Sequence, residues 1–198
     1  MLSAFSLHAS LPTALFGGTF DPIHRGHLHA AHEIIERGIA AKVIFLPAGE
    51  PWQKSKDLTA TAIERAAMVA TAIADNPNFQ LSTREIERVG PTYTIDTVRE
   101  YQEEFPAEDF VLLVGSDAFN GISTWKEADE LLQSIDLVVA IRPGEELANI
   151  PGAHFHVIES DMFDISSTEI RRFAQSHGDL SKLVPLPIVR EVERIYGA

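Results

Sequence analysis

The stretch Gly17–His27, which reads GGTFDPIHRGH, decides the fold of this chain of 198 residues. It follows a short apolar run, Thr13–Gly17, and leads into an amphipathic stretch, so the pattern predicts a strand, a tight turn and the start of a helix. The two leading glycines let the backbone turn sharply and come close to a ligand phosphate. Gly26 removes a side chain where the helix begins, and His27 falls in its first turn, where free N–H groups attract phosphate.

Two histidines of this stretch, His24 and His27, can point at the same anion. The alternative is a tight turn that carries two incidental surface histidines. A nicotinamide-dinucleotide dehydrogenase is disfavoured because the G-x-G-x-x-G fingerprint is absent. A metal site that adds His29 and His32 is weaker still, since these two share a helix face turned away from the loop and no carboxylate stands at a familiar spacing.

Short apolar runs alternate with longer amphipathic stretches along the whole chain. Most of the runs are β-branched or aromatic and bounded by Gly or Pro, which favours strands over helices. The expected strands are Thr13–Gly17, Lys42–Pro47, Phe79–Ser82, Phe110–Gly115, Asp136–Ile141 and Phe155–Ile158. Helical spacing of apolar residues predicts helices around Leu28–Arg37, Thr61–Asp75, Ile95–Phe105, Leu131–Leu132, Ile170–Phe173 and Ile188–Ile195. The alternation predicts an α/β, doubly wound fold with a mostly parallel, Rossmann-like sheet and helices on both faces.

In such a sheet the ligand lies beyond the carboxyl ends of the strands, near the point where the strand order reverses. The segments that follow five of the expected strands are unusual in composition. They are Gly17–His27, Ala48–Lys54, Gly115–Ala118, Arg142–Gly144 and Asp164–Arg171. Because these segments share one edge of the sheet, the sequence predicts a composite site there.

The last of these segments, DISSTEIR, reads as the start of a helix. Ser166 followed by Glu169 fits a capping box. Side chains tilt toward the N-terminus of a helix, so Arg171, one turn in, can reach back to an anion held at that end. Arg172 lies about 100° further round and faces elsewhere. An ordinary structural cap is the alternative reading of this segment taken alone.

Three further candidates remain open on the residues themselves. Lys54 and Lys56 could concentrate positive charge for a polyanion, or they could be solvated surface residues. Trp125 could stack on a flat ring or belong to the core. The segment Thr92–Thr94 offers hydroxyl and N–H groups, yet it also suits the N-cap of the helix that Ile95 begins.

The composition describes a globular chain with 45% hydrophobic and 23% charged residues and a net charge of −13. Such an acidic chain lacks the electrostatic footprint of a nucleic-acid binder or of a protein held on anionic lipid. The absence of cysteine excludes disulfides and thiolate catalysis and fits the reducing cytoplasm. No apolar run approaches the roughly 18 residues of a membrane span. We therefore expect a short extension, residues 1–12, and one cytoplasmic domain, residues 13–198, with homo-oligomer formation left open.

GGTFDPIHRGH resembles the G-x-F-x-P-x-H-x-G-H signature of the nucleotidyltransferase superfamily, and ISSTEIR is similar to its second signature, I-S-S-T-x-I-R. Within that superfamily the combination of PWQK, GPTYTIDT, GSDAF, STW and RPG resembles the bacterial nicotinate-nucleotide adenylyltransferases. The resemblance runs from about Ala14 to the C-terminus. One departure is the run Pro51–Lys54, where many relatives have a His-containing P-P-H run.

The resemblance implies transfer of AMP from ATP to nicotinate mononucleotide, which gives nicotinate adenine dinucleotide and pyrophosphate in NAD biosynthesis. It implies catalytic roles for His24, His27 and Arg171. The implied ATP-binding residues are Gly17, Gly18, Thr19, Phe20, Gly26, Gly115, Asp117, Ile165, Ser166 and Ser167. The implied residues for the acceptor are Lys54, Tyr93, Thr94 and Trp125. Mg²⁺ is expected to arrive with ATP, without a dedicated set of protein ligands.

Other readings stay open. The acceptor could be nicotinamide mononucleotide or phosphopantetheine, since recognition would depend on a few N–H donors. A tRNA synthetase core shares an H-x-G-H-like turn, but the acidic charge and the short chain count against it. A nucleotide-binding regulator without catalysis is disfavoured by the intact pair of histidines and Arg171.

Overall fold

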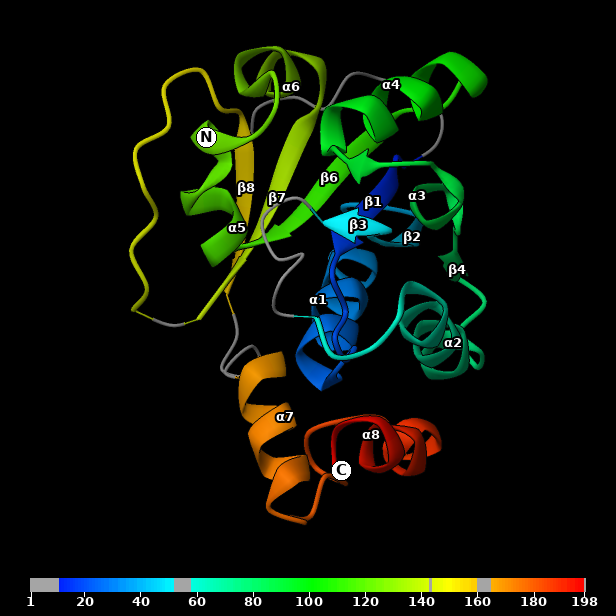
Figure 1. Cartoon of the computed structure of the whole chain (residues 1–198). Coiled ribbons are helices and arrows are strands. Elements are labelled where there is room, and N and C mark those ends of the chain that lie inside the picture. The colour runs from blue at the N-terminus through cyan, green and yellow to red at the C-terminus, as the bar shows by residue number, and fades with distance from the viewer. Residues whose placement is uncertain (1–10, 52–57, 143, 160–164, 198) are drawn as a thin grey trace.

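The computed structural model describes residues 11–51, 58–142, 144–159 and 165–197. Its centre is a six-stranded sheet in which every neighbouring pair is parallel (Figure 1). The strands are β1 (Thr13–Gly18), β2 (Lys42–Pro47), β4 (Phe79–Leu81), β6 (Phe110–Gly115), β7 (Asp136–Ile141) and β8 (Phe155–Glu159). Their order is β4-β2-β1-β6-β7-β8, so the winding reverses between β1 and β6. All six predicted strands and the doubly wound fold are confirmed.

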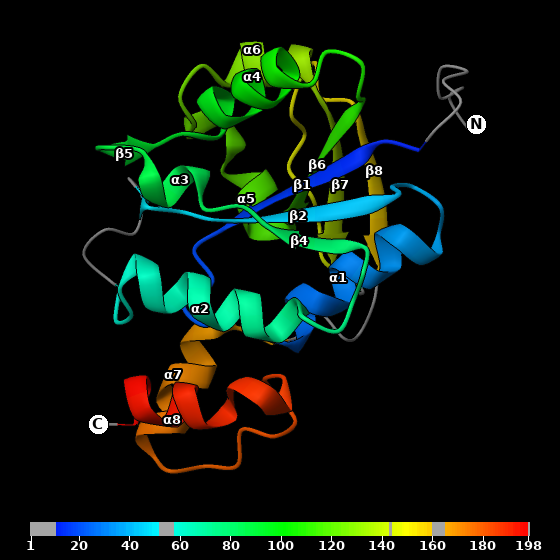
Figure 2. The ribbon, with the colours of Figure 1, turned by 90° about the vertical axis from the view of Figure 1, so that its right-hand side faces the viewer.

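Helices cover both faces of the sheet. One face carries α1 (Arg25–Glu36) and α2 (Ala62–Ile73), and the other carries α4 (Thr94–Glu104), α5 (Ser116–Asn120) and α6 (Ala128–Ser134). Figure 2 shows α4 and α6 above the sheet and α1 and α2 below it. Beyond α2 lie α7 (Ser167–Gln175) and α8 (Val189–Tyr196), which pack on each other. None of the described helices is long and apolar enough to cross a membrane.

The two faces divide the core into two clusters. Along β1, Ala14 and Phe16 belong to the cluster under α1 and α2, whereas Leu15 between them belongs to the cluster under α4 and α6. Successive side chains of a strand point to opposite faces, so a strand with every position apolar must be covered twice. The run Val111–Val114 of β6 is buried at each position for this reason.

Smaller elements were not expected from the sequence. The strands β3 (Glu50–Pro51) and β5 (Pro91–Thr92) pair in parallel outside the main sheet. The short helix α3 (Arg84–Glu87) and the 3-10 turns η1 (Ile122–Thr124) and η3 (Leu186–Ile188) fill the connections. They are too short to leave a periodic signal, yet β5, α3 and η1 flank the site described next.

Candidate functional site

The loop after β1 leads directly into α1, beside the point where the strand order reverses. His24 is the N-cap residue of α1, and His27 lies in its first turn. Their rings stack with centroids 3.6 Å apart. The backbone N–H of His24 donates to Nδ1 of His27 over 3.2 Å, so a neutral His27 carries its proton on Nε2. The structure therefore brings the two predicted histidines together and places the N–H donor of a neutral His27 at Nε2.

Phe20 is the buried aromatic residue of this loop. Its backbone has φ of 50°, in the left-handed region that a bulky residue seldom occupies. The ring is buried, packs edge-on against Phe16 with centroids 5.5 Å apart, and lies 5.0 Å from the ring of His27. Core packing holds this strained backbone in place. The side chain of Phe20 thus supports the histidine ring, and a ligand would meet the loop backbone.

His24 is almost completely buried, and burial lowers its pKa from the ordinary value of 6.5 to about 3. The protonated form cannot be solvated there, so the imidazole is neutral at physiological pH. A neutral ring binds phosphate oxygens through one N–H group and contributes no net charge. Positive charge near the loop must come from another residue.

This burial predicts a stability effect in acid. Below pH 6.5 the unfolded chain binds a proton at His24 that the folded chain excludes until about pH 3, so the folded state loses stability as the pH falls. The loss between pH 7.5 and pH 5 is expected to be about 2 kcal/mol from this group. Urea unfolding of the unaltered protein and of His24→Gln at the two pH values measures it.

The variant should lack this part of the acid destabilisation, whatever its stability at pH 7.5. His32→Gln is the matched control because His32 is exposed on α1, and it should keep the full pH dependence. An equal pH dependence in His24→Gln and the unaltered protein would show that His24 is not held neutral.

Arg171 lies next to the loop, as its place one turn into α7 predicts. Its Nη2 reaches back to Oγ1 of Thr168 (3.3 Å), and its Nη1 donates to the backbone carbonyl of Asp21 (2.8 Å). Ser167 donates from its hydroxyl to the carbonyl of Pro22 over 3.0 Å. Ser166 is the N-cap of α7, because its hydroxyl accepts from the Glu169 N–H. The Glu169 carboxylate accepts from that hydroxyl, where the predicted capping box would have it accept from the Ser166 N–H. Two of these contacts join the start of α7 to the loop, and the others lie within the start of the helix itself.

Asp21 anchors the loop to distant parts of the chain. Its buried carboxylate accepts from the backbone N–H groups of Thr59 and Ala60, both at 3.1 Å, and from the hydroxyl of Tyr196 at 2.6 Å. The nearest distance between its carboxylate and the guanidinium of Arg171 is 3.9 Å. Sequence reasoning missed Tyr196, which reaches the loop from the C-terminal helix.

Arg65 is a second residue that sequence reasoning missed. It is buried within α2 and donates to three backbone carbonyls, of Thr19 (2.6 Å), Ala48 (2.6 Å) and Gly49 (3.1 Å). The guanidinium therefore joins the loop after β1 to the loop after β2. One signal was available, since an arginine interrupts the otherwise apolar face that Met68 and Val69 form at helical spacing.

A cavity of about 180 Å³ opens beside the loop. The predicted residues Gly17, Gly18, Thr19 and Gly115 line one part of it, and Tyr93, Thr94 and Trp125 line another. Trp125 also packs against the core cluster under α4, so it belongs to the edge of the core, and its stacking on a flat ring stays a prediction. Tyr93 is the N-cap of α4 and lines the cavity as well. Residues outside the predicted site also contribute to the lining, among them Ala48, Glu85, Ile95 and Lys126.

The remaining predicted residues that the structure describes do not line this cavity. Asp117 is exposed in the first turn of α5, Gly26 is buried at the start of α1, and Ile165 and Ser166 are half-buried just before α7. Lys54 and Lys56 lie outside the described residues. So does most of the run Pro51–Lys54, in which this chain differs from the P-P-H run of many relatives.

The cytidylyltransferase-like family model matches residues 15–173 of this chain. A probable nicotinate-nucleotide adenylyltransferase of Paenarthrobacter aurescens is 39% identical over 181 residues, which cover 91% of this chain and 87% of that protein. A protein of the same name from Streptomyces coelicolor is 38% identical, with 90% and 96% covered.

Solved structures agree on the fold. Plasmodium falciparum nicotinic acid mononucleotide adenylyltransferase, complexed with NaAD, superposes with a TM-score of 0.77 over 91% of this chain and 96% of that chain. The two sequences are 21% identical, so this likeness concerns the arrangement of helices and strands.

Proposed function

This chain belongs to the nicotinate-nucleotide adenylyltransferases within the cytidylyltransferase-like family, and we propose that it joins the AMP moiety of ATP to nicotinate mononucleotide. The products are nicotinate adenine dinucleotide and pyrophosphate, and the reaction is a step of NAD biosynthesis. The domain that carries it begins at residue 13, the first residue of β1. One observation carries the proposal. The cavity at the strand reversal is lined by the glycine loop, Gly17–Thr19, and by two aromatic side chains, Tyr93 and Trp125.

The reaction needs alignment and charge stabilisation from this chain. A phosphate oxygen of the acceptor, already ionised at neutral pH, attacks the α-phosphorus of ATP in line. The new P–O bond forms while the bond to the bridging oxygen breaks, and pyrophosphate leaves with its electron pair. No general base is required, so the site needs donors that face the charge as it builds up.

The residues around α1 supply such donors. His27 contributes its Nε2–H group, and His24 contributes a neutral ring at the N-terminus of α1. Arg171 adds the positive charge that the buried histidine cannot carry. The backbone of Gly17–Thr19 binds phosphates of ATP. Asp117 and Gly115 lie next to its ribose and adenine, and Ile165–Ser167 also contact ATP. For the acceptor, Tyr93, Thr94 and Trp125 hold the pyridine ring, and Lys54 receives its phosphate.

Mg²⁺ that travels with ATP suits this donor set. Among the described residues, no three His, Asp or Glu side chains are grouped to hold a metal ion. The carboxylate of Asp21 is already occupied by the N–H groups of Thr59 and Ala60 and by the Tyr196 hydroxyl. We propose that the ion is held chiefly by phosphate oxygens and that, when bound, it would neutralise part of the triphosphate charge.

Pyrophosphate release tests the proposal. The enzyme is incubated with ATP and Mg²⁺ and, in parallel, with nicotinate mononucleotide, nicotinamide mononucleotide or phosphopantetheine. Strong release with the first acceptor alone is expected. Release with another acceptor would keep the mechanism and overturn the substrate, and no release with any of them would support a nucleotide-binding regulator.

A further inference from the structure

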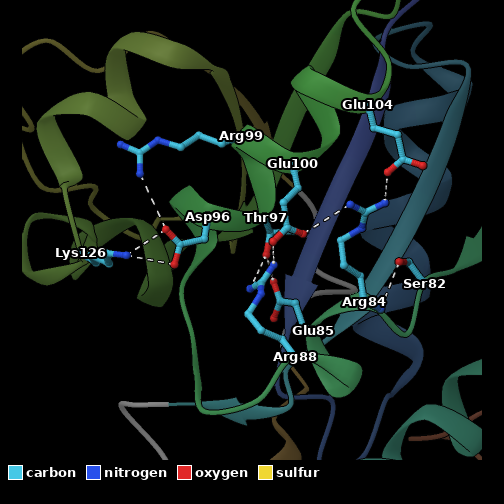
Figure 3. A network of polar contacts seen from close by, with 10 residues as sticks. All are labelled: Ser82, Arg84, Glu85, Arg88, Asp96, Thr97, Arg99, Glu100, Glu104 and Lys126. Atoms are coloured by element: carbon cyan, nitrogen blue, oxygen red, sulfur yellow. Dashed lines mark hydrogen bonds and ion pairs between the residues drawn. The ribbon is translucent and has the colours of Figure 1, made fainter.

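The start of α4 forms one wall of the cavity through Thr92–Ile95, and this wall is tied down by a residue that does not line the cavity. Thr97 is buried one turn further into α4. Its hydroxyl donates to Oε1 of Glu85 over 2.8 Å and accepts from Nη1 of Arg88 over 3.2 Å. Figure 3 shows the side chains of Glu85 and Arg88 both pointing toward Thr97. The hydroxyl of Thr97 is thus engaged as donor and as acceptor at once.

Glu85 continues this chain of contacts toward the loop after β2. The residue is buried in α3, and it lines the cavity. Its backbone packs so closely on Gly49 that a Cβ at position 49 would lie 2.2 Å from the Glu85 carbonyl oxygen. Only a residue without a side chain fits there. The neighbouring Ala48 donates its N–H to the carbonyl of Gly18 over 2.9 Å.

The contacts therefore run from Gly18 to Ala48, along the chain to Gly49, and from there through Glu85 to Thr97. They link the glycine loop, proposed to hold ATP, to the wall of α4, proposed to hold the acceptor. In-line transfer depends on the distance between two bound substrates, and a misplacement of about 1 Å can cost 10²-fold in rate. This link, which is buried at Glu85 and Thr97, is positioned to set that distance.

We propose that Thr97 and Glu85 are positioning residues for the acceptor, and that their hydrogen bond holds the Tyr93–Thr94 wall at the distance from the glycine loop that adenylyl transfer requires. This inference rests on the proposed function and extends it to residues that contact neither reacting phosphate. Arg88 supports the pair, since its Nη2 donates to Oε1 of Glu100 over 2.7 Å and so keeps the guanidinium against Thr97.

The test compares Thr97→Val with Thr97→Ser. Valine matches threonine in shape and removes the hydroxyl, whereas serine keeps it. The KM for nicotinate mononucleotide and kcat are measured with ATP saturating, and the dissociation constant of ATP is measured separately by calorimetry. We expect Thr97→Val to lower kcat/KM for the acceptor about tenfold or more, with ATP affinity within about twofold of the unaltered enzyme. Thr97→Ser should restore most of kcat/KM.

Two further variants separate positioning from a general loss of structure. Glu85→Gln keeps an oxygen that can accept from Thr97, so it should retain more activity than Glu85→Leu. Glu104→Gln breaks the ion pair of Arg84 with the far end of α4 and leaves the cavity wall alone, so it should leave the acceptor KM unchanged. Circular dichroism and ATP binding confirm that each variant is folded.

An acceptor KM and kcat in Thr97→Val equal to those of the unaltered enzyme would overturn the positioning role alone. Equal losses in Thr97→Val and Thr97→Ser would do the same, because the hydroxyl would then not matter. An unaltered enzyme that turns over no acceptor would overturn the proposed function and this inference with it.

Discussion

Replacing His27 by alanine is expected to lower kcat about 10²-fold or more and to leave the fold nearly intact, as the removal of a preorganised donor does. The ring is only half-buried, so little packing is lost. Its Nδ1 accepts from the His24 backbone N–H, so a neutral ring carries its proton on Nε2, the donor that we propose for the phosphates. Steady-state kinetics with both substrates varied, together with urea unfolding, measures the two effects.

Two amide variants distinguish the roles of the two ring nitrogens of His27. His27→Asn would place a side-chain oxygen near the position of Nδ1, so this variant keeps an acceptor for the helix start and lacks the distal donor. His27→Gln places an amide N–H near the position of Nε2. We therefore expect His27→Gln to retain more activity than His27→Asn. Near-normal turnover in His27→Ala would remove His27 from the mechanism.

Arg65→Met is expected to have the largest effect on stability, a loss of roughly 3 kcal/mol or more in the free energy of unfolding. Methionine fills much of the space but leaves the carbonyls of Thr19, Ala48 and Gly49 without their buried donors. It also removes the positive charge that faces the buried carboxylate of Asp21. Urea unfolding at pH 7.5 gives the change in stability.

The same variant should lose activity beyond its loss of stability, because the glycine loop would no longer be joined to the loop after β2. Arg194→Met is the matched control. Arg194 is largely exposed and pairs with Glu64 and Glu191 on the surface, so its loss should change the free energy of unfolding by no more than about 0.5 kcal/mol. Similar stability losses in the two variants would show that burial of Arg65 is not what matters.

The pattern of the sequence predicted the elements that local chemistry specifies. Each strand of the main sheet was expected within one residue of its observed ends, since apolar runs bounded by Gly or Pro carry their own signal. The helix α1 begins at Arg25, three residues before the periodic apolar positions start, because its N-cap is His24. Caps of this kind leave no mark in the apolar periodicity.

The convergence of the loops was also within reach of the sequence. Parallel strands place their carboxyl ends at one edge, so Gly17–Thr19, Gly115 and the start of α7 had to lie near one another once the fold class was known. Gly26 marked the start of this helix and so placed His27 in its first turn.

Only the tertiary structure decided which residues hold the site in shape. Arg65, Tyr196 and Thr97 come from three helices that are far apart in the chain, and each reaches its partner through packing of those helices on the sheet. No local pattern encodes such a contact, because a hydrogen bond between distant residues depends on where two elements lie in space. The sequence by itself determined the sheet, the phosphate-binding turn and the edge where the site forms. The buried polar contacts that set the distances within the site follow from the packed fold, where an unpaired donor or acceptor is costly.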